Sequence, residues 1–337
     1  MVADRSAWLE ERKKGIGGSD VAAVIGINPW RTSLDVYSDK LGLVEQKEIS
    51  EATHFGIQLE QIVAKEFQSR TGMKVQKVNY TFHDSDNDWM IANIDRAIIN
   101  PDICKLVKPC ISDKEKEKFK GRPLTTDIAF EAKTANQYFA ADWGPSQEQE
   151  IKAGNIVSEH VIPLYYETQL QWYCGILNLR GMYLGVLIGG QDYRMYWIPA
   201  RPDVFEALKA KCSEFWHENV LKKVPPAPTN IEDVLKLYSN SNGQEVEAKG
   251  DLALNYGELS RLDGQIKELT KQKNKVKEKV ALDMKDNEVL TLAGNKVLTY
   301  RTQTIKRFDI EEFKEDYTDL YHQYLKETTT RVMRLCA

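Results

Sequence analysis

Two acidic residues and a lysine lie in apolar segments of the first half of the chain, at a spacing that suits metal-dependent chemistry. Asp95 lies within MIANIDRAI (90–98), and Glu131 and Lys133 lie within FEAKT (130–134). If residues 125–134 form a strand, alternation places Glu131 and Lys133 on one face and Ala132 on the other. Charged groups among apolar strand residues are costly to bury, so they are usually paired or bound to a metal.

These residue types match the needs of phosphodiester hydrolysis. Carboxylate oxygens are the ligands that Mg²⁺ and Mn²⁺ prefer, and such a cation lowers the pKa of bound water and polarises a phosphate. Lys133 can orient or deprotonate the water, or stabilise charge that develops on phosphorus. Glu60, on a predicted helix just after Gly56, is a third acid. The plainer alternatives are an exposed ion pair for E-x-K and a solvated helix surface for Glu60.

A glycine-rich segment, GIGGSD (15–20), follows Arg12 near the N-terminus. A guanidinium binds phosphate bidentately, and main-chain N–H groups at the start of a helix add further donors. Residue types alone favour a simpler capped turn here, with Ser19 and Asp20 at the N-cap of a helix over residues 21–25.

The elements that must position these residues alternate between helices and strands. The patterns predict strands over residues 73–82, 89–99 and 125–134, and a hairpin over 182–198 that turns at 189–192. Helices are predicted over residues 4–14, 32–41, 53–71, 165–180 and 202–222. This order indicates an α/β domain over residues 1–223.

The character of the chain changes after VPPAPTN (224–230), which is the best candidate for a linker. In the C-terminal region, 231–337, residues 247–285 are highly charged with apolar positions three and four apart, which predicts a coiled coil or a helical hairpin. A β-hairpin is predicted over 288–305, followed by two short acidic helices and a final strand, TTTRVMRLC (328–336).

Composition narrows the classes of protein. The 337 residues are 42% hydrophobic and 28% charged, as in ordinary globular proteins. No apolar run reaches membrane-spanning length, and the first residues do not form a secretory signal. Five cysteines without a C-x-x-C pair argue against a disulfide framework, a zinc ribbon or an Fe–S cluster, so a reducing cytoplasm is expected. The net charge of −4 counts mildly against nucleic acid without excluding it.

Five blocks, in order, resemble the YqaJ-like phage exonucleases, relatives of the bacteriophage lambda exonuclease in the PD-(D/E)xK superfamily. The resemblance covers most of residues 5–220 and implies a restriction-endonuclease-like mixed sheet flanked by helices. The matching blocks are WLEERKKGIGGSDVAAVIGINPW (8–30), FGIQLEQIVAKEFQSRTG (55–72), MIANIDRAI (90–98), FEAKTAN (130–136) and ETQLQWYCGIL (167–177).

The resemblance also implies roles for individual residues. Lys133 would assist the attacking water, and Arg12 and Ser19 would bind the 5′-terminal phosphate. Gln169, rather than Gln171, is the site candidate on its helix. One or two Mg²⁺ ions, or Mn²⁺ in their place, would be held by Glu60, Asp95, Glu131 and the main-chain carbonyl of Ala132.

The function that this resemblance implies is 5′→3′ degradation of linear double-stranded DNA, in phage-type recombination with a RecT-like single-strand annealing protein. A phage or prophage origin and a homo-oligomer, with a trimeric ring as one arrangement, are also implied. The alternatives are another RecB- or Cas4-like nuclease, acting as an endonuclease or in repair, and a DNA-binding or assembly protein without activity. One departure from the family is the 35-residue gap between Asp95 and Glu131, which contains a basic segment, 101–122. That segment is either a solvated loop or a contact to the DNA backbone.

Overall fold

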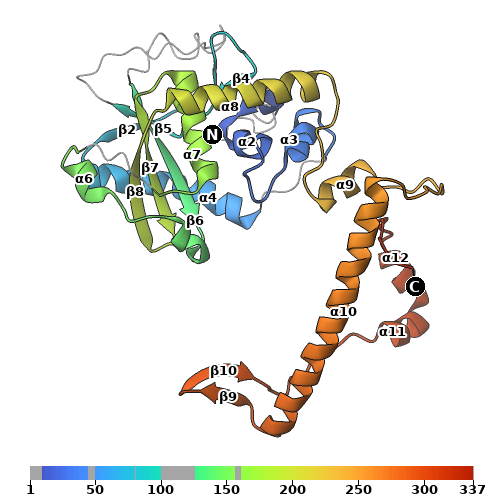
Figure 1. Ribbon diagram of the computed structural model, residues 1–337. Helices are drawn as coiled ribbons and strands as arrows, with labels where there is room; N and C mark the ends of the chain where they lie inside the picture. The colour runs from blue at the N-terminus through green and yellow to red at the C-terminus, as the bar shows by residue number, and fades with distance from the viewer. Residues whose placement is uncertain (1–9, 45–49, 80, 100–125, 156–160, 337) are drawn as a thin grey trace. The chain divides into compact units, whose positions relative to one another are not determined.

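The computed structural model describes residues 10–44, 50–79, 81–99, 126–155 and 161–336. The chain divides into two compact units, Met1–Asp233 and Val234–Ala337 (Figure 1). The basic segment 101–122, with Cys104 and Cys110, lies outside the described residues, as does the start of the first predicted helix. Within the described part of the chain, no helix is both long enough and apolar enough to cross a membrane.

A mixed five-stranded sheet forms the centre of the first unit, and a mixed sheet is what the family resemblance implies. The strand order is β2-β5-β6-β7-β8, and only β6 and β7 run parallel to each other among these neighbours. The bounds are β2 (Lys74–Lys77), β5 (Arg96–Ile99), β6 (Ile128–Ala135), β7 (Gly181–Ile188) and β8 (Asp192–Pro199). A smaller sheet has the order β1-β4-β3, with β1 (Ile16–Gly17), β3 (Phe82–His83) and β4 (Met90–Ala92).

One face of the central sheet is covered by the long helix α4 (Glu51–Thr71) (Figure 1). Ser50 caps it, and Gly72 ends it in the left-handed conformation with φ 73°. Its Phe67 packs with Ile128 and Phe130 of β6 in the main apolar cluster. Because side chains alternate along a strand, Glu131 and Lys133 lie on the opposite face, towards the other helices.

The predicted single strand over residues 89–99 is wrong, because two separate strands, β4 and β5, occupy this range. The chain leaves the small sheet at Ala92 and joins the central sheet at Arg96, so Asp95 lies at the crossing between β4 and β5. The polar pair Asn93 and Asp95 interrupts the apolar run at this point. The main-chain carbonyl of Asp95 accepts a hydrogen bond from Val78 N at 3.3 Å, while its carboxylate turns towards β6.

The helices predicted over residues 32–41, 53–71, 165–180 and 202–222 are present close to those ranges, whereas the sequence patterns do not predict the short helical elements over 137–142 and 148–152. The bounds are α2 (Gly18–Val24), α3 (Ser33–Lys40), α6 (Glu148–Lys152), α7 (Leu164–Leu177) and α8 (Pro202–Glu214), with a 3-10 turn η1 (Gln137–Asp142) and a π-helical end η2 (Phe215–Leu221). The predicted N-cap at Ser19 and Asp20 is wrong, because the N-cap is Gly17 and both residues lie in the first helical turn. There the Asp20 carboxylate accepts a hydrogen bond from Gly17 N, at 3.2 Å.

The second unit is built on one long helix, α10 (Asp251–Met284), and not on a helical hairpin. The predicted β-hairpin and the short acidic helices are present, as β9 (Val289–Leu292), β10 (Asn295–Thr299), α11 (Ile310–Asp316) and α12 (Thr318–Tyr324). The final predicted strand is wrong, since described residues 325–336 contain none. The boundary falls within α9 (Ile231–Leu237), directly after Asp233, whose buried carboxylate accepts a hydrogen bond from Thr32 within the same first unit, at 2.9 Å.

Candidate active site

Glu131 is the most deeply buried acid of the central sheet, with a relative exposure of 3%. Its neighbour on the same strand face, Lys133, donates a hydrogen bond to Glu131 Oε1 at 2.8 Å. Strand alternation brings these two side chains together, as the sequence predicts. The intervening Ala132 packs on the opposite face, against the apolar cluster under α4.

Asp95 reaches the same place from the neighbouring strand. Its Oδ2 accepts a hydrogen bond from the main-chain N–H of Ala132, at 2.8 Å. The antiparallel register of β5 and β6 pairs Arg96 with Phe130, which positions Asp95 beside Glu131. The structure thus gathers Asp95, Glu131 and Lys133 around the middle of β6.

The charges in this cluster shift one another. Burial raises the pKa of Asp95 well above its usual value, and the adjacent Glu131 carboxylate raises it further. Burial likewise raises the pKa of Glu131, although Lys133 opposes that effect. Burial alone would lower the pKa of Lys133, but Glu131 and Asp95 outweigh it and raise that pKa. Two buried carboxylates with raised pKa values hold protons more tightly than exposed acids do, unless a cation balances them.

Gln169, on α7, contacts this cluster from the face of the sheet on which Glu131 lies. Its Nε2 donates to Glu131 Oε1 at 2.8 Å and to the Tyr173 hydroxyl at 3.1 Å. Gln171 does not reach the cluster, since its side chain binds main-chain atoms of Pro199 and Arg201. The buried Trp172 likewise donates to the Ile91 carbonyl, as a core residue.

Glu60, on α4, lies at the edge of the cluster and has other partners. Its carboxylate accepts a hydrogen bond from the Arg96 guanidinium and lies 4.0 Å from Lys77 Nζ. Glu60 also raises the pKa values of Asp95 and Glu131, so its charge acts at the same centre. In the described part of the chain, no three His, Cys, Asp or Glu side chains converge as they would around a bound metal.

The donor set nevertheless fits a hard divalent cation. Glu131 Oε2 is buried and has no hydrogen-bond partner among the described residues, and the same holds for Asn93 Oδ1. An orphaned buried carboxylate oxygen is costly unless a proton or a cation satisfies it. Glu131, Asp95 and the Ala132 carbonyl are all oxygen donors, which is the chemistry that Mg²⁺ and Mn²⁺ require.

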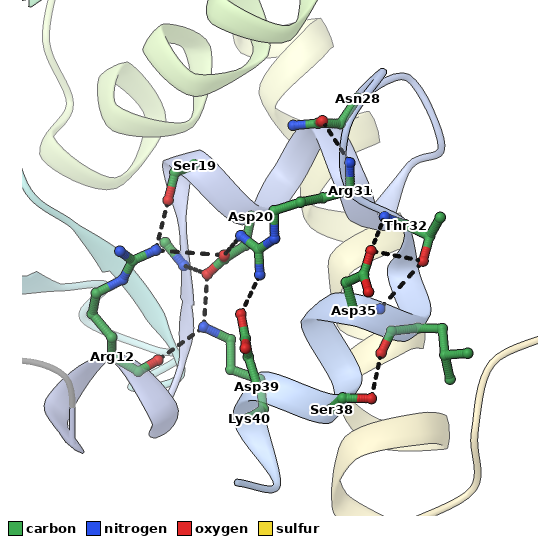
Figure 2. Close-up of polar contacts among 12 residues, drawn as sticks. Arg12, Ser19, Asp20, Asn28, Arg31, Thr32, Asp35, Ser38, Asp39 and Lys40 are labelled. Carbon is green, nitrogen blue, oxygen red and sulfur yellow. Dashed lines mark hydrogen bonds and ion pairs between the residues drawn. The ribbon is translucent and has the colours of Figure 1, made fainter. Parts of the chain in front are cut away.

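A second polar cluster surrounds Asp20, at the start of α2 (Figure 2). Arg12 Nη2 donates to Ser19 Oγ at 2.7 Å and lies 3.5 Å from Asp20 Oδ1. Arg31 and Lys40 bind the same carboxylate, at 3.0 and 2.6 Å. The two residues expected to bind a 5′-phosphate, Arg12 and Ser19, are therefore neighbours.

Three cations around one carboxylate leave this cluster basic. Burial opposes ionisation of Asp20, but Lys40, Arg12 and Arg31 outweigh it and lower the pKa of Asp20 well below its usual value. Arg31 also pairs with the Asp39 carboxylate. Counting Arg12, Arg31 and Lys40 against Asp20 and Asp39 gives three positive and two negative charges, and Arg12 remains partly exposed, at 28% for its side chain.

Gly18 links the two clusters. A Cβ built on Gly18 would lie 2.5 Å from the Tyr173 ring and 2.9 Å from Gln169 Cγ. The absence of a side chain lets the first turn of α2 rest directly on the residues that contact Glu131. The helix α2, which carries Ser19 and Asp20, therefore packs directly on α7, which carries Gln169 and Tyr173.

Sequence reasoning missed four residues of these clusters: Arg31, Lys40, Arg96 and Tyr173. Tyr173 had a signal, because it follows Gln169 by four residues on a predicted helix and so shares its face. Arg96 lies directly after Asp95 in an apolar segment, where a charge needs a partner. Arg31 and Lys40 depend on how α2 and α3 pack, which no local pattern shows.

The chain is similar in sequence to a known protein family and to one curated protein. The family model described as the YqaJ-like viral recombinase domain matches residues 7–179. The uncharacterized protein YqaJ of Bacillus subtilis (strain 168) is 29% identical over 335 residues, which cover 97% of this chain and 92% of that protein.

The solved structures that resemble the chain include two exonucleases. The alkaline exonuclease LHK-Exo from Laribacter hongkongensis is 15% identical with a TM-score of 0.45, over 69% of this chain and 97% of that chain. A phage related exonuclease from Haemophilus somnus 129PT is 12% identical with a TM-score of 0.40, over 62% of this chain and 96% of that chain.

Proposed function

The chain belongs to the YqaJ-like viral recombinase domain family, and on that premise we propose that it is a Mg²⁺-dependent exonuclease that degrades linear double-stranded DNA from the 5′ end. The observation that carries this proposal is the buried Glu131 carboxylate, with Oε1 held by Lys133 and Gln169 and Oε2 without a partner among the described residues. A carboxylate fixed on one oxygen presents the other to a ligand. A purely structural Glu131 would have both oxygens satisfied.

Glu131, Asp95 and the Ala132 carbonyl would hold the metal, with Glu60 reaching it after release from Arg96. When bound, the cation activates water and neutralises charge on the scissile phosphate. Asp95 is already oriented by the Ala132 N–H, so it needs little rearrangement to act as a ligand.

Lys133 supplies the remaining charge at this centre. Its ammonium lies 5.2 Å from the centroid of the Tyr166 ring and donates to Glu131, so it is restrained on two sides. A restrained cation beside the scissile phosphate stabilises the negative charge that develops as the phosphodiester bond breaks. Gln169 also donates a hydrogen bond to the Glu131 carboxylate and so fixes its orientation.

The basic cluster supplies recognition of the DNA end. Arg12 and Ser19 lie 2.7 Å apart and offer a guanidinium and a hydroxyl to the same phosphate. Gly18 fixes their position relative to α7, and hence to Glu131. This arrangement supports cutting from a fixed 5′-phosphate, with one cluster binding the end while the other hydrolyses a bond along the strand.

Aromatic side chains near Lys133 are suited to unpaired bases. Trp30 is 62% exposed, and its ring lies 5.1 Å from that of Tyr165. Tyr165 contacts Tyr166 at 4.5 Å, the ring beside Lys133. Exposed rings stack on bases of any sequence, as an exonuclease without sequence preference needs.

In the cell, this activity would expose single strands for a RecT-like annealing protein, in the cytoplasm of a bacterial host carrying the phage or prophage. The family description as a viral recombinase domain supports a role in recombination. A homo-oligomer, such as a trimeric ring around the DNA, would suit processive cutting.

The experiment compares linear and covalently closed circular duplexes of one sequence, with Mg²⁺ or with EDTA. Release of mononucleotides from the linear duplex alone, with a 5′-end label lost first, supports the proposal. Cutting of the circle would identify an endonuclease instead. DNA binding without cutting in any divalent metal would identify a DNA-binding or assembly protein.

A further inference from the structure

The long helix α10 carries an apolar seam that nothing in the described part of the chain buries. Five seam residues are between 40% and 63% exposed: Leu259, Leu262, Ile266, Leu269 and Val276. On the whole helix, Met284 is the single buried residue among those described. A seam of large apolar side chains in water indicates a surface that another molecule covers.

The seam follows a heptad repeat. With Leu259 at position a, the a positions are Leu252, Leu259, Ile266, Lys273 and Val280, and the d positions are Asn255, Leu262, Leu269, Val276 and Asp283. Gly257 and Gly264 fall at f, the position farthest from the seam, where no side chain has to pack. This is the pattern of a two-stranded coiled coil rather than of a helix lying on a globular surface.

No other helix described in this unit is long enough to cover the seam. Residues 252–283 span about 48 Å of helix, at 1.5 Å per residue. The helices α11 and α12 have seven residues each, or about 10 Å. A partner of matching length is another α10.

Charge decides how two α10 helices would align. In a parallel pair, Glu258 at g would face Asp263 at e of the partner helix, two like charges, and Lys273 would meet its own copy in the core. In an antiparallel pair with Ile266 opposite Leu269, Glu258 instead faces Lys279. Lys273 then lies opposite Leu262, where its stem can pack while its ammonium reaches water.

The antiparallel register also matches the apolar layers. Pairing Ile266 with Leu269 aligns Leu259 with Val276, so the three central layers on each side of the two-fold axis place an apolar residue on at least one helix. The polar seam residues Asn255 and Asp283 fall in the outer layers, opposite Val280 and Leu252. Polar residues placed this way fix the register of a coiled coil at some cost in stability.

We propose that α10 binds the α10 helix of a second copy of this chain, as an antiparallel coiled coil that joins two copies through their C-terminal units. The surface lies outside residues 1–233, so it is separate from any contact that the nuclease units make with each other. Two nuclease units tethered in this way would act on DNA ends at a raised local concentration.

The test measures the mass of the full chain in solution by light scattering and its dissociation constant by sedimentation. Ile266→Arg places a charge in the central layer and is expected to halve the particle mass. Lys271→Glu, at the outward f position, is the control and should leave the mass unchanged. A wild-type particle with the mass of one 38.6 kDa chain, or a mass that Ile266→Arg does not change, overturns the proposal.

Charge exchange tests the direction. Glu258→Lys and Lys279→Glu should each weaken association about tenfold, because each creates two like-charge pairs, and the double variant should restore it. A parallel coiled coil predicts the opposite for Glu258→Lys, since the introduced lysine would then face Asp263 of the partner helix. Stronger association of that single variant would overturn the antiparallel arrangement. Glu258 also binds Arg261 within its own helix, so helix content is measured for every variant by circular dichroism.

Discussion

Gln169 on α7 donates a hydrogen bond to Glu131 on β6, with Nε2 and Oε1 2.8 Å apart. Lys133 donates to the same oxygen, also at 2.8 Å. Two donors on Oε1 leave Oε2 buried without a partner among the described residues. The orientation of this one carboxylate therefore depends on a helix and on a strand, and that dependence makes the site sensitive to changes in α2, which packs on α7.

Gly18→Ala tests whether the packing of α2 on α7 maintains the orientation of Glu131, without changing a residue of the acidic centre itself. The added methyl group would lie 2.5 Å from the Tyr173 ring and 2.9 Å from Gln169 Cγ, so α7 or α2 has to shift. A displacement of about 1 Å in a group that positions a catalytic residue costs about 100-fold in rate. We expect nucleotide release to fall by about that factor while Mg²⁺ still binds.

Gly257→Ala, in α10, is the matched control, because nothing lies within 4 Å of the position that its new methyl group would occupy and its φ is not positive. That variant should keep full activity. Equal activity of Gly18→Ala and wild type would show that the contact between α2 and α7 does not support the site.

Arg12→Ala tests recognition of the DNA end. Arg12 binds Ser19 and faces Asp20, and it is the partly exposed cation of the basic cluster nearest to Ser19. Its loss should slow degradation of 5′-phosphorylated duplex about tenfold or more, and 5′-hydroxyl duplex much less, since one charge-assisted phosphate contact contributes about 1.5–3 kcal/mol. Lys13→Ala, next in sequence, is the control. If Arg12→Ala slows both substrates equally, Arg12 does not bind the phosphate.

Asp20→Asn tests the charge balance of the basic cluster. The pKa of Asp20 is lowered in the folded protein, so its carboxylate stabilises the fold above its unfolded pKa of about 3.9 and loses that effect as the pH falls further. At pH 7 the variant leaves the buried Lys40 unpaired and should lose about 3–5 kcal/mol of unfolding free energy.

Urea unfolding followed by tryptophan fluorescence reports this difference for the first unit alone, because all seven tryptophans precede residue 234. The gap between wild type and Asp20→Asn should narrow below pH 4. Asp39→Asn, at an exposed partner of Arg31, should cost about 1 kcal/mol or less. An equal loss for Asp20→Asn at pH 7 and at pH 3.5 would contradict the ion-pair account.

The sequence allowed part of this arrangement to be predicted. Strand alternation in FEAKT fixed the shared face of Glu131 and Lys133, and the apolar pattern with Gly72 defined α4. The position of Asp95 between two sheets could not be predicted, because strand pairing is a long-range property that local apolar runs do not encode. The same limit hid Arg31 and Lys40, which meet Asp20 only once α2 and α3 pack together.

Asp95→Asn separates metal binding from folding. Ionising Asp95 in the metal-free protein costs free energy, because burial and Glu131 raise its pKa. Removing the charge should therefore raise the thermal midpoint without metal by about 2–4 °C, equivalent to about 1 kcal/mol in a domain of this size. Affinity for Mn²⁺, measured by calorimetry, should fall at least about tenfold.

The exposed Glu206→Gln provides the control for Asp95→Asn and should change neither quantity. A variant at Asp95 with unchanged Mn²⁺ affinity would remove this residue from the metal site, and a lowered midpoint without metal would contradict the repulsion between Asp95 and Glu131.

The central claim is that the Glu131 carboxylate lies at a hydrolytic centre, and Glu131→Gln tests it most directly. Glutamine keeps the shape of the side chain and an oxygen that can accept from Lys133 and Gln169, but it removes the charge. The measurement is the initial rate of nucleotide release from linear 5′-phosphorylated duplex DNA with Mg²⁺, for two proteins shown to have the same fold. We predict a loss of about 1,000-fold or more for Glu131→Gln. A variant that retains a rate within about threefold of wild type, or a wild type that releases no nucleotides, would contradict the account.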